Sequence, residues 1–267
     1  MLIVIPEWEV AVGSLDLLEA PSLRAALSGS PGPAGRTHTA LLPLEGCERQ
    51  LLLRPLRHGG LLRGLLGPRL FGLGRPIAEL QVNAHLRARG APVPCPVLVL
   101  GRRIGPFWEA AVGTVHEQGS VDAARFLRRD PSRRRILRAA QATGRAIRQI
   151  HDAGVRHPDL HVGNLLLREG DGEIEALVVD LDGVRLVAAL SPGRRMHELA
   201  RLYRSLRKGN FLEKVGRRGI AVFLGAYTGG DRRLRRALLA RRFRHRLLIE
   251  IHALAYRRTQ GEAEDLR

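Results

Sequence analysis

Lysine is nearly absent from this sequence of 267 residues and occurs only at Lys208 and Lys214. Cysteine is equally scarce, and Cys47 and Cys95 lack metal-ligand spacing and do not suggest a disulfide framework, so we expect a reducing compartment. Aromatic residues make up 4% of the chain, which argues against a stacking platform for single-stranded nucleic acid. No apolar run approaches the ~20 residues that span a bilayer. The N-terminal segment MLIVIPEW lacks the basic start and long apolar core of a signal peptide.

Positive charge is abundant, because the net charge is +18 and arginine supplies almost all of it. Such an excess predicts anionic partners, namely a nucleotide, a nucleic acid or an acidic membrane surface. Arginine bias often reflects codon composition, however, and no nucleic-acid-binding motif is recognisable, so we expect no nucleic-acid partner. An apolar content of 45% predicts a globular protein.

The segment HPDLHVGN at residues 157–164 has the pattern H-x-D-L-x-x-x-N of a kinase catalytic loop. It follows a long helical pattern and opens two short apolar strands, 165–167 and 176–179, joined by the turn EGDG at 169–172. The second strand leads into Asp180, where kinases carry D-F-G. We therefore interpret Asp159 as the base for the attacking hydroxyl, and Asn164 and Asp180 as ligands of Mg²⁺ on the phosphates of ATP.

Several residues around this motif keep more than one interpretation. His157 is expected to hold the backbone rather than to act as an acid or base. His161 either contacts the acceptor or a phosphate, or packs as a structural histidine, and Asp182 is either a second metal ligand or a loop-stabilising carboxylate. The alternative for the whole segment is a surface loop between two hairpin strands.

The first ~115 residues have the pattern of strands with one good helix. We predict strands at 8–12, 37–42, 50–54, 97–100 and 108–115. The helix at 76–89 places Glu79 where a kinase N-terminal lobe carries the glutamate that orients a phosphate-binding cation. The loop at 28–36 stands where kinases place their phosphate-covering loop, which makes Gly35 and Arg36 candidates for nucleotide binding. Its two prolines remove backbone donors, and an ordinary surface loop is the alternative.

The second half has helical patterns around the catalytic hairpin. These are expected at residues 132–153, 196–208, 211–227 and 232–256. The sequence thus predicts an α+β, protein-kinase-like bilobal fold, with a sheet-rich N-terminal lobe at 1–117 and a helical C-terminal lobe with the catalytic loop at 118–267.

Four blocks of the sequence resemble the lipopolysaccharide kinase family, in its 3-deoxy-D-manno-octulosonic acid (Kdo) kinase branch. They are RHGGLLRGLL at 57–66, the stretch from Arg75 to Pro94, the catalytic hairpin, and HELARLYRSL at 197–206. The resemblance implies a kinase-like fold, Mg-ATP as donor, and a sugar of a lipid A precursor as acceptor at the cytoplasmic membrane face. It also implies Asp159 as catalytic base, Asn164 and Asp180 as metal ligands, and Glu79 as the helix glutamate.

The sequence departs from ordinary kinases in its third strand, where Arg54 stands in place of the usual lysine. Arginine can bridge a phosphate and Glu79 with its planar fork, or it can simply extend from a strand edge into solvent. The catalytic loop also looks like that of aminoglycoside and choline phosphotransferases. A small-molecule kinase is therefore one alternative, and a nucleotide-binding scaffold that has lost catalysis is another.

Residues 232–248 form a basic pattern with apolar positions four or five apart. Either this apolar stripe packs on the helical lobe and the arginines are solvated, or the arginines attract anionic lipid at ~1 kcal/mol per basic residue near the surface. The second interpretation predicts a cytoplasmic protein that is peripheral to the inner face of the inner membrane, where a lipid-linked acceptor is available.

Overall fold

The computed structural model describes residues 1–13, 15, 17, 39–56 and 69–241. These residues form two compact units, and each is described by itself. Unit 1 comprises Met1–Gln118 and Asp180–Val184, and unit 2 comprises Gly119–Val179 and the chain from Arg185 onward. The functional division into lobes 1–117 and 118–267 stays a prediction. Among the described residues, no helix combines the length and the apolar character that crossing a bilayer requires.

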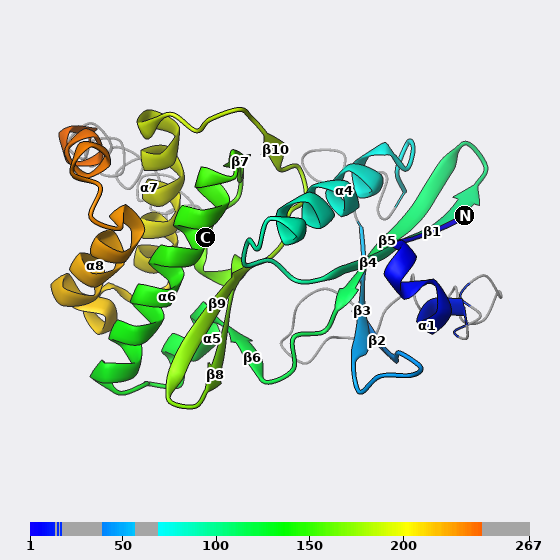
Figure 1. Cartoon of the computed structure of the whole chain (residues 1–267), viewed down its shortest axis with the longest axis horizontal. Coiled ribbons are helices and arrows are strands. Elements are labelled where there is room, and N and C mark those ends of the chain that lie inside the picture. Colours follow the sequence, from blue (N-terminus) through cyan, green and yellow to red (C-terminus); the bar gives the residue numbers. More distant parts are fainter. Residues whose placement is uncertain (14, 16, 18–38, 57–68, 242–267) are drawn as a thin grey trace, which may run out of the picture. The chain divides into compact units, whose positions relative to one another are not determined.

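An antiparallel sheet in the order β1-β4-β5-β3-β2 is the centre of unit 1 (Figure 1). The predicted strands at 50–54, 97–100 and 108–115 are confirmed. Of the strand predicted at 37–42, residues 37 and 38 lie outside the described residues and the remainder falls largely in β2. The first strand was not predicted, because three residues are too few for a pattern of alternation. The strands are β1 Leu2–Val4, β2 Ala40–Pro43, β3 Gln50–Pro55, β4 Pro96–Ile104 and β5 Phe107–Val115.

The predicted strand at 8–12 is wrong. Pro6–Trp8 forms a 3-10 helix, η1, and Glu9–Gly13 forms the short helix α1. Trp8 and Val12 are both buried, and side chains four residues apart lie on one face of a helix. Proline near the helix start also favours a helical turn over a strand.

Each face of the sheet in unit 1 buries its own apolar cluster. Leu51 and Leu53 of β3 belong to the cluster that includes Trp8 and Val12, whereas Val112 of β5 belongs to the cluster on the opposite face. That second cluster includes Leu80 of helix α4, Gly74–Ala88. Because side chains alternate along a strand and Arg54 pairs directly with Val112, Arg54 lies on the face that α4 covers.

Two predicted helices begin earlier than their sequence patterns indicated. Helix α4 begins at Gly74 rather than at 76, and helix α7 begins at Pro192 rather than at 196. The hydroxyl of Ser191 accepts a hydrogen bond from the backbone N–H of Arg194, at 3.4 Å. Serine before the helix and proline in its first turn are both favoured at helix starts, and this signal lies upstream of the apolar stripe.

Unit 2 is mainly helical and also contains a three-stranded antiparallel sheet, β6-β8-β9, and a two-stranded sheet, β10-β7. The helices predicted at 132–153 and 211–227 are confirmed to within one residue at each end; residues 232–241 are helical and 242–256 lie outside the described residues. The elements are β6 Ser120–Asp122, α5 Ala123–Arg128, α6 Arg133–Asp152, β7 Val155–Arg156, η3 Val162–Asn164, β8 Leu165–Gly170, β9 Glu173–Val178, β10 Arg185–Leu186, α7 Pro192–Lys208 and α8 Leu212–Thr228.

The hairpin of β8 and β9 closes within the predicted turn at 169–172, but the turn is shorter than predicted, because Glu169 and Gly170 belong to β8. Asp171 and Gly172 both have positive φ, 48° and 76°, which is the backbone of the tight two-residue turn that Asp-Gly favours. Gly170 pairs with Glu173, so the two strands are in register from the turn onward. The hairpin therefore begins directly after the catalytic loop and returns the chain to Val179.

Helices α6 and α8 pack closely along one face of α6, and Gly144 makes this approach possible. A Cβ atom at position 144 would lie 2.5 Å from the carbonyl oxygen of Phe223 in α8. That oxygen belongs to the backbone and cannot turn aside as a flexible side chain could. The small residue at 144 therefore sets the spacing between the two helices.

We expect Gly144→Ala to lower the free energy of unfolding by about 1–3 kcal/mol, because the added methyl group overpacks a rigid interface. Gly225→Ala in α8 is the matched control, since a Cβ there meets nothing within 4 Å. In an open helical position, alanine stabilises by about 0.5–1 kcal/mol relative to glycine. Urea unfolding followed by circular dichroism measures both variants, and equal effects of the two would contradict the packing argument.

Candidate functional site

The predicted site residues fall into two groups, one in each unit. Arg54, Glu79 and Asp180 come together in unit 1, whereas Asp159 and Asn164 come together in unit 2. Gly35 and Arg36, predicted to contact the nucleotide, lie outside the described residues. The two groups are therefore described one after the other.

Arg54 forms an ion pair with two carboxylates in unit 1. Its guanidinium hydrogen-bonds to Oε1 of Glu79, which is buried on α4, and its Nη1 atom lies 3.3 Å from Oδ1 of Asp180. The prediction that Arg54 approaches Glu79 is confirmed, and the alternative of an arginine extending from a strand edge into solvent is wrong. The alternation of β3 explains this contact, because it directs Arg54 towards α4.

Burial and charge act in opposite directions on this group of side chains. Burial alone would lower the pKa of Arg54, but the charges of Glu79 and Asp180 outweigh it and the pKa is raised. Burial raises the pKa of Glu79, and the charge of Arg54 opposes that rise only in part. One guanidinium thus balances two carboxylates, and this leaves the group short of positive charge.

Two buried oxygens in this group have no hydrogen-bond partner among the described residues, namely Oε2 of Glu79 and Oδ1 of Asp180. Buried carboxylate oxygens without a donor are unfavourable unless a cation or ligand satisfies them. Oδ1 of Asp180 nevertheless has the Arg54 guanidinium beside it, at 3.3 Å, so a cation already faces this oxygen. A carboxylate is also the kind of ligand that Mg²⁺ uses, together with substrate phosphates. No three His, Cys, Asp or Glu side chains within the described ranges form a metal-binding group by themselves.

The backbone at Asp180 is in the left-handed region, with φ at 63°. Aspartate tolerates this region better than most residues, because its short polar side chain can bond locally. Asp182, two residues further on, is held by Arg75 in the first turn of α4 through Nε–H to Oδ1 at 2.5 Å and a second bond from Nη2. Of the two interpretations of Asp182, the structure therefore shows the loop-stabilising one.

The backbone of the catalytic loop in unit 2 is fixed by buried polar side chains. Nδ1 of His157 accepts a hydrogen bond from the backbone N–H of Asp159 at 3.3 Å, and its Nε2 atom lies 3.3 Å from the carbonyl oxygen of Val179. Because Nδ1 accepts, the ring proton belongs on Nε2, where it is donated to that carbonyl. The expectation that His157 holds the backbone is confirmed.

Asn164 holds the far end of the same loop. Its side-chain Nδ2 donates to the backbone carbonyl oxygen of Asp159 at 3.0 Å. The backbone carbonyl oxygen of Asn164 accepts from the backbone N–H of Val179 at 2.9 Å. With the amide donor engaged in this way, the side-chain oxygen is the end that suits a cation. Asn164 is 5% exposed, so this orientation is set by packing as well as by hydrogen bonding.

The carboxylate of Asp159 itself is 63% exposed, with a basic side chain beside each of its oxygens. Nη1 of Arg201 lies 3.4 Å from Oδ1, and Nε2 of His161 lies 3.5 Å from Oδ2. His161 also accepts from the backbone N–H of Gly163 at 2.9 Å and so caps the short helix η3. His161 is thus structural, and it contacts the carboxylate as well.

Helix α7 supports the catalytic loop through residues that the motif did not reveal. The carboxylate of Glu198 accepts the backbone N–H of His157 at 3.1 Å, and the hydroxyl of Ser205 accepts that of Val162 at 3.1 Å. Glu198, Arg201 and Ser205 are spaced by three and four residues and therefore lie on one face of the helix. That spacing within HELARLYRSL is the sequence signal that could have identified them.

Glu198 also joins a buried network with His151 and Tyr227. Nε2 of His151 lies 3.1 Å from the Glu198 carboxylate, and Nδ1 lies 2.7 Å from the hydroxyl of Tyr227. Burial lowers the pKa of His151 and raises that of Tyr227 to about 12, so both are neutral at neutral pH. The network therefore ties α6, α8 and α7 to the start of the catalytic loop through neutral groups and one carboxylate.

An apolar cavity of about 760 Å³ lies among helices α5, α6, α7 and α8 of unit 2. Val162 and Leu165 of the catalytic segment line it, together with Phe126, Leu199 and Phe223. Its size is within the range of small-molecule sites, which are concave and mostly apolar. The cavity therefore places apolar binding space directly beside the loop that carries Asp159.

Comparisons with known proteins identify relatives of this chain. A 3-deoxy-D-manno-octulosonic acid kinase of Vibrio cholerae is 28% identical over 198 residues, which cover 73% of this chain and 78% of the relative. Enzymes of the same name from Xylella fastidiosa and Photobacterium damsela are 31% and 30% identical, over 62% and 66% of this chain and 65% and 70% of the relatives.

The solved structure of WaaP in complex with acyl carrier protein matches with a TM-score of 0.61 and 21% identity, and the match covers 96% of this chain and 98% of that one. This likeness confirms the predicted kinase-like α+β fold. Residues 37–227 match the sequence profile of the lipopolysaccharide kinases. The chain belongs to the lipopolysaccharide kinase (Kdo/WaaP) family.

Proposed function

We propose that this protein transfers the γ-phosphoryl group of ATP to a sugar hydroxyl of a lipid A precursor, with Kdo as the acceptor sugar. One observation carries the proposal: the Asp159 carboxylate is exposed to solvent on a loop whose backbone is held by His157 and Asn164. A general base must be accessible to its substrate and yet fixed in position.

In this mechanism Asp159 accepts the proton of the acceptor hydroxyl as that oxygen attacks phosphorus. His161 and Arg201 lie beside its two oxygens and hold the carboxylate in position. We propose Asn164 and Asp180 as ligands of Mg²⁺, which neutralises the charge of the nucleotide phosphates when it is bound. Turnover is then limited by how well these groups orient the acceptor and the phosphate.

Arg54 takes the place of the usual kinase lysine in this proposal. Glu79 holds it on one side, and its Nη1 faces Asp180. A guanidinium has five donors in a planar fork, so it can keep the bond to Glu79 while another edge binds a phosphate oxygen. The absence of lysine from the third strand is therefore compatible with nucleotide binding and does not require a scaffold that has lost catalysis.

A lipid-linked acceptor is favoured by the apolar cavity of unit 2. A sugar phosphotransferase for soluble alcohols has no need of about 760 Å³ of apolar space beside its catalytic loop. The structural neighbour was solved with acyl carrier protein, whose name also indicates a lipid-related partner. We therefore propose that the acceptor brings an acyl chain to the protein along with its sugar.

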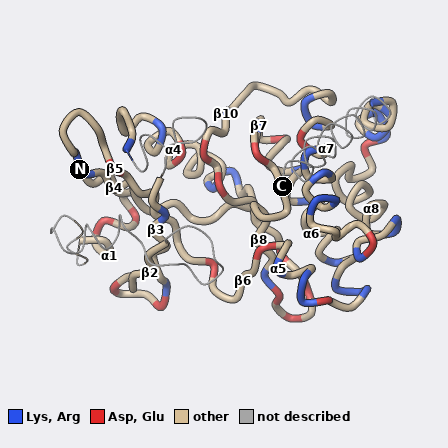
Figure 2. The backbone as a smooth tube through the Cα atoms, turned by 180° about the vertical axis from the view of Figure 1, so that it is seen from behind, with Lys and Arg blue, Asp and Glu red and all other residues tan. Residues whose placement is uncertain are grey.

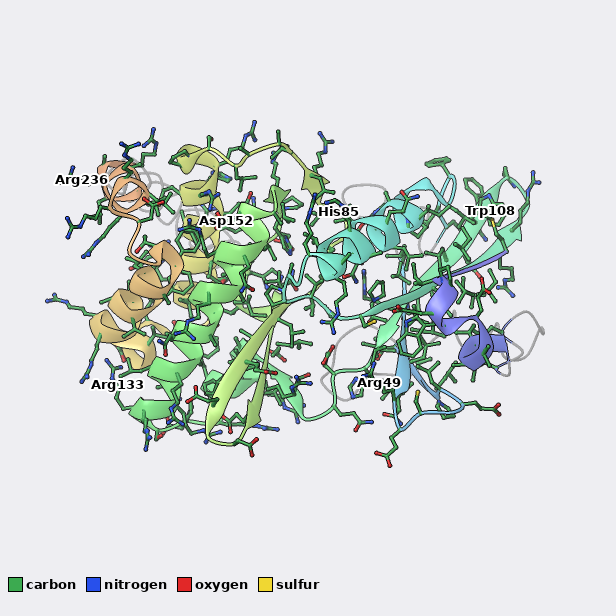
Figure 3. The ribbon with its side chains drawn as sticks, viewed as in Figure 1. Arg49, His85, Trp108, Arg133, Asp152 and Arg236 are labelled. Atoms are coloured by element: carbon green, nitrogen blue, oxygen red, sulfur yellow. The ribbon has the colours of Figure 1, made fainter. Side chains whose placement is uncertain are left out.

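We also propose that the protein acts at the inner face of the inner membrane as a peripheral cytoplasmic protein. Figure 2 shows lysine and arginine gathered along the helices of unit 2. In the helical residues 232–241, Leu234 and Leu238 are buried, whereas Arg232, Arg235 and Arg236 are exposed. The apolar stripe thus packs within unit 2, and the arginines, including Arg236 at the outer side in Figure 3, remain available to anionic lipid.

The acceptor is tested by following labelled phosphate from ATP to a panel of compounds. We expect transfer to a lipid A precursor that carries Kdo, because such an acceptor has both a hydroxyl for Asp159 and an acyl chain for the apolar cavity. Aminoglycosides and choline serve as soluble controls. Transfer to the soluble compounds alone would instead support the small-molecule kinase, and ATP binding without transfer to any compound would support the scaffold.

The two carboxylates should have separable roles. We expect Asp159→Asn to lower turnover by ~10²–10⁴-fold with nearly unchanged ATP affinity, the usual span for a general base. Asp180→Asn should weaken Mg-ATP binding as well, because it removes charge from the metal site while asparagine still tolerates the left-handed backbone. Steady-state kinetics and nucleotide titration measure both effects.

Asp171→Asn is the matched control for these variants, since Asp171 also has a left-handed backbone, with φ at 48°, in the exposed turn of the β8–β9 hairpin. It should retain the activity and nucleotide affinity of the unmodified protein. If Asp159→Asn were as active as this control, Asp159 would not be the base.

Membrane binding should depend on charge. We expect strong sedimentation with anionic liposomes at low salt and a steep loss as salt rises, because exposed charges are screened. Replacing Arg232, Arg233, Arg235 and Arg236 with glutamine should weaken binding. Glutamine at Arg133, Arg134, Arg217 and Arg218, four exposed arginines elsewhere in unit 2, is the matched control. No preference for anionic lipid, or equal losses in the two variants, would remove the membrane-surface role.

A further inference from the structure

The face of α7 next to the catalytic loop carries a row of basic side chains. His197, Arg201 and Arg204 are spaced by four and three residues, so they lie along one stripe of the helix. Arg201 lies within 3.4 Å of the Asp159 carboxylate. The middle member of the row therefore lies at the proposed catalytic base, and the row extends along α7 on both sides of it.

Arg204 makes no hydrogen bond or ion pair with the part of the chain that the structure describes. Partial burial lowers its pKa, and the charges of Arg201 and Arg207 lower it further. No carboxylate is among the causes of this shift, although a guanidinium remains charged in any protein environment. Like charges one helical turn apart are destabilising, so this grouping is unfavourable until an anion is present.

The acidic groups nearby do not remove this excess of positive charge. Glu198 is buried, and its carboxylate already accepts from His151 and His157. Asp159 is shared between Arg201 and His161. In addition, Nε of Arg201 is buried and has no hydrogen-bond partner among the described residues. The Nε–H of Arg201 and the positive charge of Arg204 thus have no partner among the described residues.

We propose that Arg201 and Arg204 bind an anionic group of the acceptor, a carboxylate or a phosphate, and thereby place its neighbouring hydroxyl at Asp159. This inference rests on the proposed phosphotransfer and adds the charge of the acceptor. Guanidinium groups match carboxylate and phosphate oxygens in a bidentate manner, which fixes orientation as well as position. Arg201 contacts the acceptor and the base together, whereas Arg204 contacts the acceptor alone.

The test uses Arg204→Gln in the full chain, because Arg204 has no partner in the loop whose loss would disturb Asp159. Three acceptors are compared: a Kdo-bearing lipid A precursor, the same lipid with the Kdo carboxylate converted to a carboxamide, and the same lipid without its phosphates. Arg194→Gln, an exposed arginine in the first turn of α7, is the matched control.

We expect Arg204→Gln to raise the KM for the intact acceptor by about 10-fold to 100-fold, the range for losing a charged hydrogen bond. The KM for ATP should be unchanged, and Arg204→Lys should recover part of the loss. The variant should have no effect on whichever modified acceptor lacks the recognised anion, which tells carboxylate from phosphate. Equal losses with all three acceptors, or no loss at all, would overturn the inference.

Binding of the same lipids without ATP, measured by calorimetry in detergent, separates this inference from the proposed function. If the unmodified protein binds the anionic acceptor through Arg204 but transfers no phosphate, the phosphotransfer fails and the anion site stands. If it transfers phosphate and Arg204→Gln binds all three lipids as the unmodified protein does, the anion site fails and the phosphotransfer stands.

Discussion

The catalytic loop depends on the buried carboxylate of Glu198. This one group accepts the backbone N–H that opens the loop at His157 and contacts the ring of His151 on α6. A buried charge is unfavourable unless its hydrogen bonds are satisfied, so the carboxylate requires both donors in these places. Helices α6 and α7 and the loop therefore adopt one arrangement together, and Tyr227 extends that arrangement to α8.

In the catalytic loop, hydrogen bonds hold the backbone, whereas the side chain of Asp159 is exposed to solvent. His157 and Asn164 bond the backbone N–H and the carbonyl oxygen of Asp159, and Ser205 accepts the backbone N–H of Val162. The Asp159 carboxylate thus stays exposed while the backbone that carries it is held in position. This combination is what a general base needs, and it arises from neutral donors and acceptors rather than from a large number of ion pairs.

In the proposed function, arginine performs tasks that ordinary kinases divide between lysine and other groups. Arg54 bridges Glu79 and Asp180, and Arg75 fixes Asp182 nearby in the same unit. In unit 2, Arg201 reaches the catalytic carboxylate. Because a guanidinium has several donors in one plane, each of these side chains can hold a carboxylate and still present an edge to a ligand. The scarcity of lysine is therefore compatible with the chemistry of the family.

The sequence by itself determined the kinase-like α+β fold, a hairpin that turns within residues 169–172, and the candidate residues Asp159, Asn164 and Asp180, because local pattern and motif spacing encode them. It also placed Arg54 in the third strand. The sequence left two positions open for Arg54, and the tertiary structure decided that it meets Glu79, since that contact depends on which face of the sheet α4 covers. The role of Asp182 was likewise decided by Arg75, more than a hundred residues away in the chain. The supports from Glu198 and Ser205 could not be read from the catalytic-loop motif, because they lie on another helix and only their spacing on α7 signals them. Tyr227 reaches the network through His151, a contact that only the tertiary structure shows.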